Sequence, residues 1–167
     1  RFVIRIFMQQ KFEIVSVESV TPELSVPEGC VVEGWEDCYR YDLKKADELL
    51  ALTARADIGQ AVVVEAGLVL GLETLQGTDA LLDFVRQTEK RLRHPTKRGI
   101  LVKRPKICQD LRVDVPVIGP KTIENAATAG LAGLVISPKS VLLIQRSNLI
   151  DRARTLGIFI QALERTV

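Results

Sequence analysis

The sequence predicts an α/β (α+β) protein, in which a mixed β-sheet with hairpins packs against helices as a single domain with an N-terminal arm. Short runs rich in valine, leucine and isoleucine recur along the chain, as expected for buried strands. Between them lie segments whose apolar residues return every three to four positions, which is typical of helices with one buried face. The chain has 167 residues, 47% of them hydrophobic, which is enough to bury one core.

The first 40 residues are expected to form an N-terminal strand or arm and a linker, ahead of a domain at residues 41–167. The run from Phe2 to Phe7 suits a strand or a helix, and the run from Phe12 to Val17 alternates as a strand would. From Ser19 to Arg40 the prolines and glycines predict irregular structure.

A helix, a hairpin and a second helix are expected next. Asp42 is a suitable N-cap for a helix that runs to about Arg55 with one apolar stripe. The run AVVVEAGLVLGLE predicts two strands joined at Ala66-Gly67, where glycine readily supplies the positive φ of a tight turn. Helical spacing then extends from Leu81 to Leu92, and Thr78 or Asp79 can cap the first turn.

The second half of the chain follows a similar order of hairpin, helix and strand. Strands at Gly133 to Ile136 and at Val141 to Ile144 would form the hairpin, and a helix at Ser147 to Leu156 precedes a strand at Ile158 to Ala162. The two halves are therefore either an internal repeat or two independent occurrences of the same local order of elements. A short helix from Pro120 to Gly130 separates the two halves.

The most polar stretch, Gly99 to Thr122, contains the candidate site. From Lys90 to Lys106 there are eight lysines and arginines and no acidic residue, which predicts a local positive field suited to phosphate groups. Carboxylates that could hold Mg²⁺ or orient a water beside such a phosphate are Glu73, Asp79, Asp110 and Asp114. The alternative is an exposed charged loop in which Asp114 pairs with Arg112 or caps a turn.

Other chemistries and compartments find less support. The three cysteines lack C-x-x-C spacing, which argues against a disulfide framework and a zinc site. We expect His94 to be a solvated loop residue. Cys108 has positive neighbours that could lower the pKa of its thiol, but no histidine adjoins it, which argues against a thiol nucleophile. The basic run has no interleaved aromatic residues, which argues against nucleic acid and suits an anionic membrane surface. No apolar stretch is as long as a membrane span and Arg5 interrupts the first one, so the cytoplasm is expected.

Two stretches, GQAVVVEAGLVLGLETLQGTDALL and GILVKRPKICQDLRVDVPVIGPKTIENAATAGLAGLVI, resemble the C-terminal domain of the LpxI-type UDP-2,3-diacylglucosamine pyrophosphatases. The match runs from about Asp57 to Ile160 in order and with similar spacing. It implies a Mg²⁺-dependent hydrolase of lipid A biosynthesis, cytoplasmic and peripheral to the inner membrane, that converts UDP-2,3-diacylglucosamine to lipid X and UMP. The family's N-terminal domain is missing here, so the resemblance implies one wall of a two-domain cleft and a chain inactive alone.

The resemblance also implies which residues serve the reaction. Asp114, in the R-x-D-x-P pattern that starts at Arg112, corresponds to the family's essential aspartate and to a ligand of Mg²⁺. Asp79 is implied as a second metal ligand, and Gln76 stands where the family has an acidic residue. Substrate and phosphate contacts are implied for Lys103, Lys106, Gln109, Arg112, Thr78 and Asp79.

Two other classes of function stay open at this point. One is a non-catalytic module that binds a nucleotide sugar or a lipid phosphate. The other is a peripheral anchor that uses the basic run from Lys90 to Arg98 on an anionic membrane. A homodimer is one compatible assembly, and no nucleic-acid partner is expected.

Overall fold

Strands and helices alternate through the computed structural model, which describes residues 2–107 and 109–165. The strands are β1 (Gly29–Val32), β2 (Ala61–Glu65), β3 (Leu68–Leu72), β4 (Ile100–Lys103), β5 (Val117–Ile118), β6 (Gly133–Ile136), β7 (Leu142–Leu143) and β8 (Phe159–Ala162). The α-helices are α1 (Phe2–Gln9), α2 (Val17–Val20), α3 (Arg40–Ala54), α4 (Gly77–Arg86), α5 (Pro120–Thr128) and α6 (Arg146–Leu156). The 3₁₀ helices are η1 (Pro22–Leu24), η2 (Asp37–Tyr39) and η3 (Lys90–Leu92).

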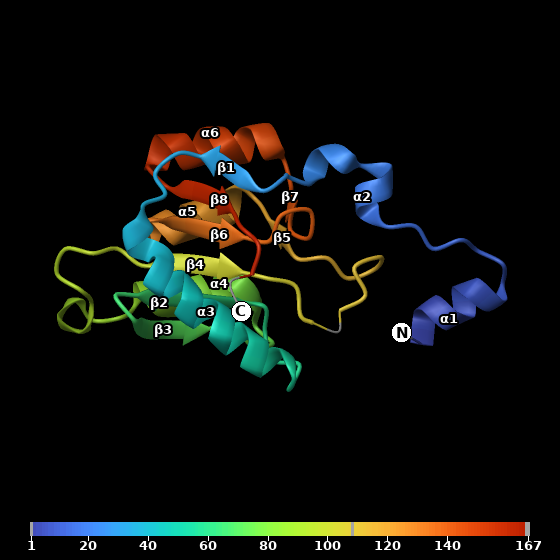
Figure 1. Cartoon of the computed structure of the whole chain (residues 1–167), viewed down its shortest axis with the longest axis horizontal. Helices are drawn as coiled ribbons and strands as arrows, with labels where there is room; N and C mark the ends of the chain where they lie inside the picture. The colour runs from blue at the N-terminus through green and yellow to red at the C-terminus, as the bar shows by residue number, and fades with distance from the viewer. Residues whose placement is uncertain (1, 108, 166–167) are drawn as a thin grey trace.

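A mixed sheet forms the centre of the described part of the chain. It has six strands in the order β1-β8-β6-β4-β2-β3, and a separate pair joins β5 to β7. Strand β6 runs parallel to both β4 and β8, whereas β2 is antiparallel to β3 and to β4 (Figure 1). The predicted α/β fold with a mixed sheet and packed helices is therefore confirmed.

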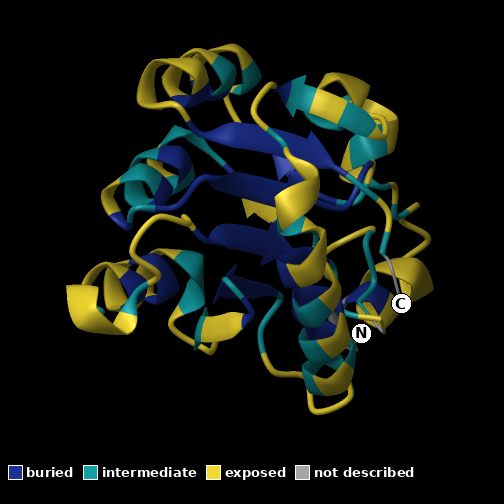
Figure 2. Cartoon of the chain, turned by 60° about the vertical axis from the view of Figure 1, so that its left-hand side comes forward, coloured by how far each residue is buried: buried dark blue, intermediate teal, exposed yellow. Residues whose placement is uncertain are grey.

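Helices cover both faces of this sheet. Side chains alternate along β2, so that Val62 and Val64 pack with Leu43 of α3, and Val63 packs with Leu82 of α4 on the other face. Helices α5 and α6 join α4 on that second face. The edge strands β1 and β3 and the outer faces of the helices are partly exposed, whereas strands β2, β4, β6 and β8 are buried along their whole length (Figure 2). Burial on both faces explains why these strands read as continuous apolar runs.

Asp42 does not cap α3, and that prediction is wrong. The helix begins two residues earlier, at Arg40. The buried Asp42 carboxylate instead accepts hydrogen bonds from the backbone N–H of Ala66, at 3.0 Å, and of Gly67, at 2.6 Å. These two residues have φ values of +49° and +81°, so the tight turn between β2 and β3 is confirmed. Asp42 therefore holds this turn against α3.

The N-terminal segment differs from expectation in two places. Residues Phe12 to Val17 form no strand in the described chain, where α2 begins at Val17, because no other strand lies beside them to pair with. Within the stretch predicted to be irregular, β1 pairs with β8, and its register shifts between Cys30 and Val32. Helix α1 projects away from the sheet (Figure 1). No helix of the described residues has the length and apolar character that a membrane span requires.

The hairpin predicted at Gly133 to Ile144 is also wrong. Both edges of β6 are occupied, one by β4 and the other by β8, so no edge is left for the next strand. Strand β7 pairs instead with β5 in a parallel arrangement outside the main sheet. The second half of the chain therefore lacks the hairpin that an internal repeat requires.

Helix α4 is shorter than its apolar spacing predicted. It ends at Arg86, and the separate 3₁₀ helix η3 contains Leu92. Neither Thr78 nor Asp79 is its N-cap, because the helix already begins at Gly77 and both residues lie inside its first turn. Their side chains are thereby directed to partners outside the helix.

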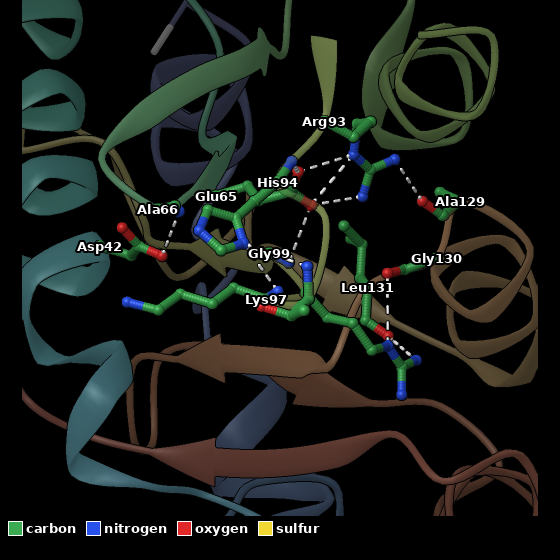
Figure 3. Close-up of polar contacts among 12 residues, drawn as sticks. Asp42, Glu65, Ala66, Arg93, His94, Lys97, Gly99, Ala129, Gly130 and Leu131 are labelled. Carbon is green, nitrogen blue, oxygen red and sulfur yellow. Dashed lines mark hydrogen bonds and ion pairs between the residues drawn. The ribbon is translucent and has the colours of Figure 1, made fainter. Parts of the chain in front are cut away.

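Glu65, at the end of β2, anchors the loop that leads into β4 (Figure 3). Its carboxylate is 2% exposed and accepts hydrogen bonds from Arg93 Nη2 at 2.6 Å, His94 N at 2.8 Å and Gly99 N at 3.1 Å. Arg93 also donates to the carbonyl of Ala129 at 3.0 Å. One carboxylate thus fixes both ends of the loop.

This arrangement predicts a loss of stability in acid. Burial raises the pKa of the Glu65 carboxyl, but the hydrogen bonds and positive charge of Arg93, with the two backbone N–H groups, lower that pKa below its ordinary 4.5. The unfolded chain therefore binds the extra proton first, and the stabilisation is complete above pH 4.5 and lost as pH falls through the lowered pKa. Urea midpoints of wild type and Glu65→Gln between pH 7 and pH 3 should differ less as the pH falls. A constant difference would contradict this role.

Candidate active site

A cavity of about 650 Å³ lies at the carboxyl end of β4. Because β2 is antiparallel to β4, the segment before β2 reaches this edge, and so does the segment after β3. The cavity is lined by residues 57–60, residues 73–75, Lys106 and Asp114. Two of the residues implied by the resemblance, Asp114 and Lys106, therefore share one cavity with segments from the β2–β3 hairpin.

Asp114 is the carboxylate in this cavity that has no side-chain partner among residues 2–107 and 109–165. Its backbone N–H donates to Asp110 O at 3.0 Å, and its exposed side chain makes no hydrogen bond or ion pair with any described residue. Arg112 pairs with Asp110 instead, through contacts of 2.9 Å and 2.7 Å. The side-chain hydrogen bonds from Arg112 hold the pKa of Asp110 at about 2. The pairing of Asp114 with Arg112 that was open from sequence is thus not formed.

Lys106 and Gln109 shape the loop between β4 and Asp114. The Lys106 ammonium lies 2.6 Å from Asp57 Oδ1, at the other wall of the cavity. The Gln109 amide oxygen accepts a hydrogen bond from Lys106 N at 2.9 Å. Gln109 therefore supports the loop backbone, while Lys106 brings a cation to the cavity. Cys108 lies outside the described residues.

Lys103 and Thr78 connect to the cavity through Glu73; Lys103 is buried and Thr78 is half-buried. Lys103 is 5% exposed. Its ammonium group donates hydrogen bonds to Thr78 Oγ1 at 2.8 Å and to Val117 O at 3.0 Å. Burial lowers the pKa of Lys103, and the negative charges of Glu73 and Asp79 oppose that shift. Thr78 in turn donates to Glu73 Oε2 at 2.8 Å.

Asp79 faces α5 rather than the cavity lining. Its carboxylate lies 3.2 Å from Lys121 Nζ and accepts a hydrogen bond from Asn125 Nδ2 at 2.9 Å. Among the described residues, the structure does not bring Asp79 into the lining that Asp114 and Lys106 share. Its role as a metal ligand stays a prediction.

The basic run from Lys90 to Lys106 is divided between the two ends of β4, and much of its charge is paired. Arg93 contacts Glu65 at one end, and Arg104 contacts Asp47 at the other. A second cavity, of about 590 Å³, adjoins the first of these ends and is lined in part by His94, which accepts hydrogen bonds from its own loop through Nδ1. The eight basic residues therefore do not form one group at the candidate site, and Arg93 and Arg104 serve the fold through ion pairs.

Sequence reasoning missed the residues that precede β2. A Cβ added to Gly59, which has a φ of +54°, would lie 1.9 Å from Glu73 O, so this position needs glycine. The close approach places Asp57 and Gln60 on the same wall as Glu73. A glycine followed by a polar residue directly before a buried strand was the available signal.

The fold and this cavity define a class of protein: an α/β domain whose polar site is built by loops at one end of a mixed sheet. Residues 27–161 match the family model described as the LpxI C-terminal domain, and the chain belongs to that family.

A curated relative supports this membership. The chain is 38% identical over 157 residues to the UDP-2,3-diacylglucosamine pyrophosphatase LpxI of Caulobacter vibrioides. The match covers 92% of this chain and 56% of the relative, so the chain spans little more than half the length of that protein.

Proposed function

We propose that this chain is the catalytic C-terminal part of an enzyme that hydrolyses the diphosphate of UDP-2,3-diacylglucosamine. In this reaction water attacks one phosphorus and the bond between that phosphorus and the bridging oxygen breaks. The products are UMP and lipid X (2,3-diacylglucosamine 1-phosphate), with release of two protons when both phosphate monoesters are fully ionised. The name of the Caulobacter relative supports the substrate. The observation that carries the proposal is the unpartnered Asp114 carboxylate in a cavity that also holds a lysine.

The cavity and its loop provide groups that can orient the attacking water and groups that can neutralise the phosphate charge. Asp114 can accept a hydrogen bond from the attacking water or bind a cation, since its oxygens have no partner among the described residues. Lys106 and Arg112 lie on the same loop and can exchange their present carboxylate partners for phosphate oxygens. Charge neutralisation of this kind is a large term in phosphoryl transfer.

Magnesium fits the oxygen donors of this cavity. No group of three or more His, Cys, Asp or Glu side chains is arranged for a metal among the described residues. Mg²⁺, however, is commonly held by one or two carboxylates together with substrate phosphates, and Asp114 is available for that. When bound, Mg²⁺ would neutralise charge on the diphosphate oxygens.

The rest of the enzyme is part of the proposal. We infer from the 56% coverage that a further, N-terminal domain closes the cleft over the substrate. The acyl chains of the substrate place the reaction at the inner-membrane surface, with the protein cytoplasmic and peripheral.

The test is to incubate the full-length protein with UDP-2,3-diacylglucosamine and Mg²⁺ and to quantify both products. We expect equal amounts of UMP and lipid X, and no release when EDTA is present. A titration that shows binding of substrate without either product would support a non-catalytic binding module instead.

A further inference from the structure

Glu73 lies between the interior of the protein and the cavity. The residue directly follows β3, and its backbone N–H donates to Ala61 O at 2.8 Å, which fixes its main chain to β2. Glu73 is only 7% exposed, yet it lines the cavity that contains Asp114. A carboxylate in this position has lost most of its hydration and needs compensating partners.

One oxygen of Glu73 is held by a directed chain of hydrogen bonds. Lys103 Nζ donates to Thr78 Oγ1, and Thr78 Oγ1 donates to Glu73 Oε2, each at 2.8 Å. A hydroxyl has one proton, so the lysine can only donate to this threonine and the carboxylate can only accept from it. These two hydrogen bonds therefore join the buried Lys103 ammonium to the buried Glu73 carboxylate through one hydroxyl.

The other oxygen of Glu73 is left for the cavity. No described residue donates to Oε1. Nor is Oε1 among the sealed side-chain atoms without a partner, which in the described chain are Gln60 Oε1 and Arg165 Nη1. Glu73 therefore presents one fixed, accessible carboxylate oxygen to the space that Asp114 and Lys106 also line.

We infer that Glu73 is a second catalytic carboxylate of this site, whose Oε1 accepts a hydrogen bond from the attacking water. This inference rests on the proposed function. Thr78 and Lys103 are then positioning residues: the hydroxyl fixes the orientation of the carboxylate, and the ammonium group fixes the orientation of the hydroxyl. The inference gives Lys103 and Thr78 a positioning role next to the cavity, in addition to the phosphate contact that the resemblance implies.

The test compares Glu73→Gln with Glu89→Gln in the full-length protein. Both variants exchange a carboxylate for an amide, but Glu89 is exposed and contacts Arg91 on the surface. Glu73→Gln should lower kcat by about 100-fold or more, with KM changed by less than about threefold, because the water and not the substrate is misplaced. Glu89→Gln should be as active as wild type.

Thr78 provides the second variant. Thr78→Val keeps the shape of the side chain but removes the donor, and should lower kcat about tenfold, whereas Thr78→Ser should restore it. If the melting temperature of Glu73→Gln is far below that of wild type, the kcat values of Thr78→Val and Thr78→Ser test the inference in its place.

Three results separate the possible failures. If the full-length wild-type protein is active and its Glu73→Gln variant is equally active, the inference about Glu73 is overturned and the proposed function is kept. A loss of Mn²⁺ affinity of tenfold or more in Glu73→Gln, measured by calorimetry, would overturn the water-orienting role in favour of a metal ligand. If the full-length wild-type protein releases no UMP, the proposed function is overturned and this inference with it.

Discussion

Asp114→Asn is expected to lower UMP release by roughly 10³-fold or more, because it removes the carboxylate that we propose to act on the attacking water or on a bound cation. The carboxylate is exposed and supports no packing, so the amide should fit without distortion. The hydrogen bond from Asp114 N to Asp110 O involves the main chain and is retained. Thermal melting of the variant should match wild type, which would assign the loss to chemistry.

Asp151→Asn is the matched control for this substitution. Asp151 lies on the outer face of α6, 74% exposed, with Arg154 at 4.0 Å. Product release by this variant should equal wild type, because exposed pairs of this kind contribute little. If Asp114→Asn retains more than a tenth of wild-type activity, Asp114 is not the catalytic carboxylate.

Arg104→Met is expected to destabilise the fold by about 3–5 kcal/mol, the usual cost of removing one partner from a buried ion pair. Arg104 is 1% exposed and contacts both carboxylate oxygens of Asp47, at 2.9 Å and 3.2 Å. It also donates to Ser137 Oγ and to the carbonyl of Leu163. The substitution leaves the Asp47 carboxylate in the interior without this guanidinium. Urea unfolding of the full chain measures the effect.

A double substitution distinguishes the effect of the Arg104–Asp47 ion pair on stability from the effect of the side-chain packing around it. Asp47→Leu combined with Arg104→Met removes both charges, and should recover much of the lost stability because apolar groups can replace a buried pair. Arg154→Met on the surface should change the free energy of unfolding by less than about 0.5 kcal/mol. A double variant no more stable than Arg104→Met would contradict this account of Arg104.

Local patterns predicted the elements that depend on neighbouring residues. The β2–β3 hairpin, β6, α6 and β8 all follow from apolar spacing and turn chemistry within a few positions. The failures depend on distant partners. Residues 12–17 alternate like a strand but meet no other strand, and β7 leaves the main sheet because β4 and β8 already flank β6.

The candidate site shows the same division. Charge in the loop after β4 predicted a polar site, and resemblance to a known family singled out Asp114 within it. Sequence could not show which cations were already paired, because the partners of Arg93, Arg104 and Lys106 lie 28, 57 and 49 positions away along the chain. Nor could it show that Glu73 and Asp114 share a cavity, since that depends on the register of three strands.

The position of the site is tested most directly by amide chemical-shift mapping of the ¹⁵N-labelled chain with UDP and Mg²⁺. We expect the largest changes in residues 57–60, 73–75, 106 and 114, which line the cavity at the carboxyl end of β4. Changes confined to residues 36–42 and 94–98, around the cavity at the opposite end, would contradict the account.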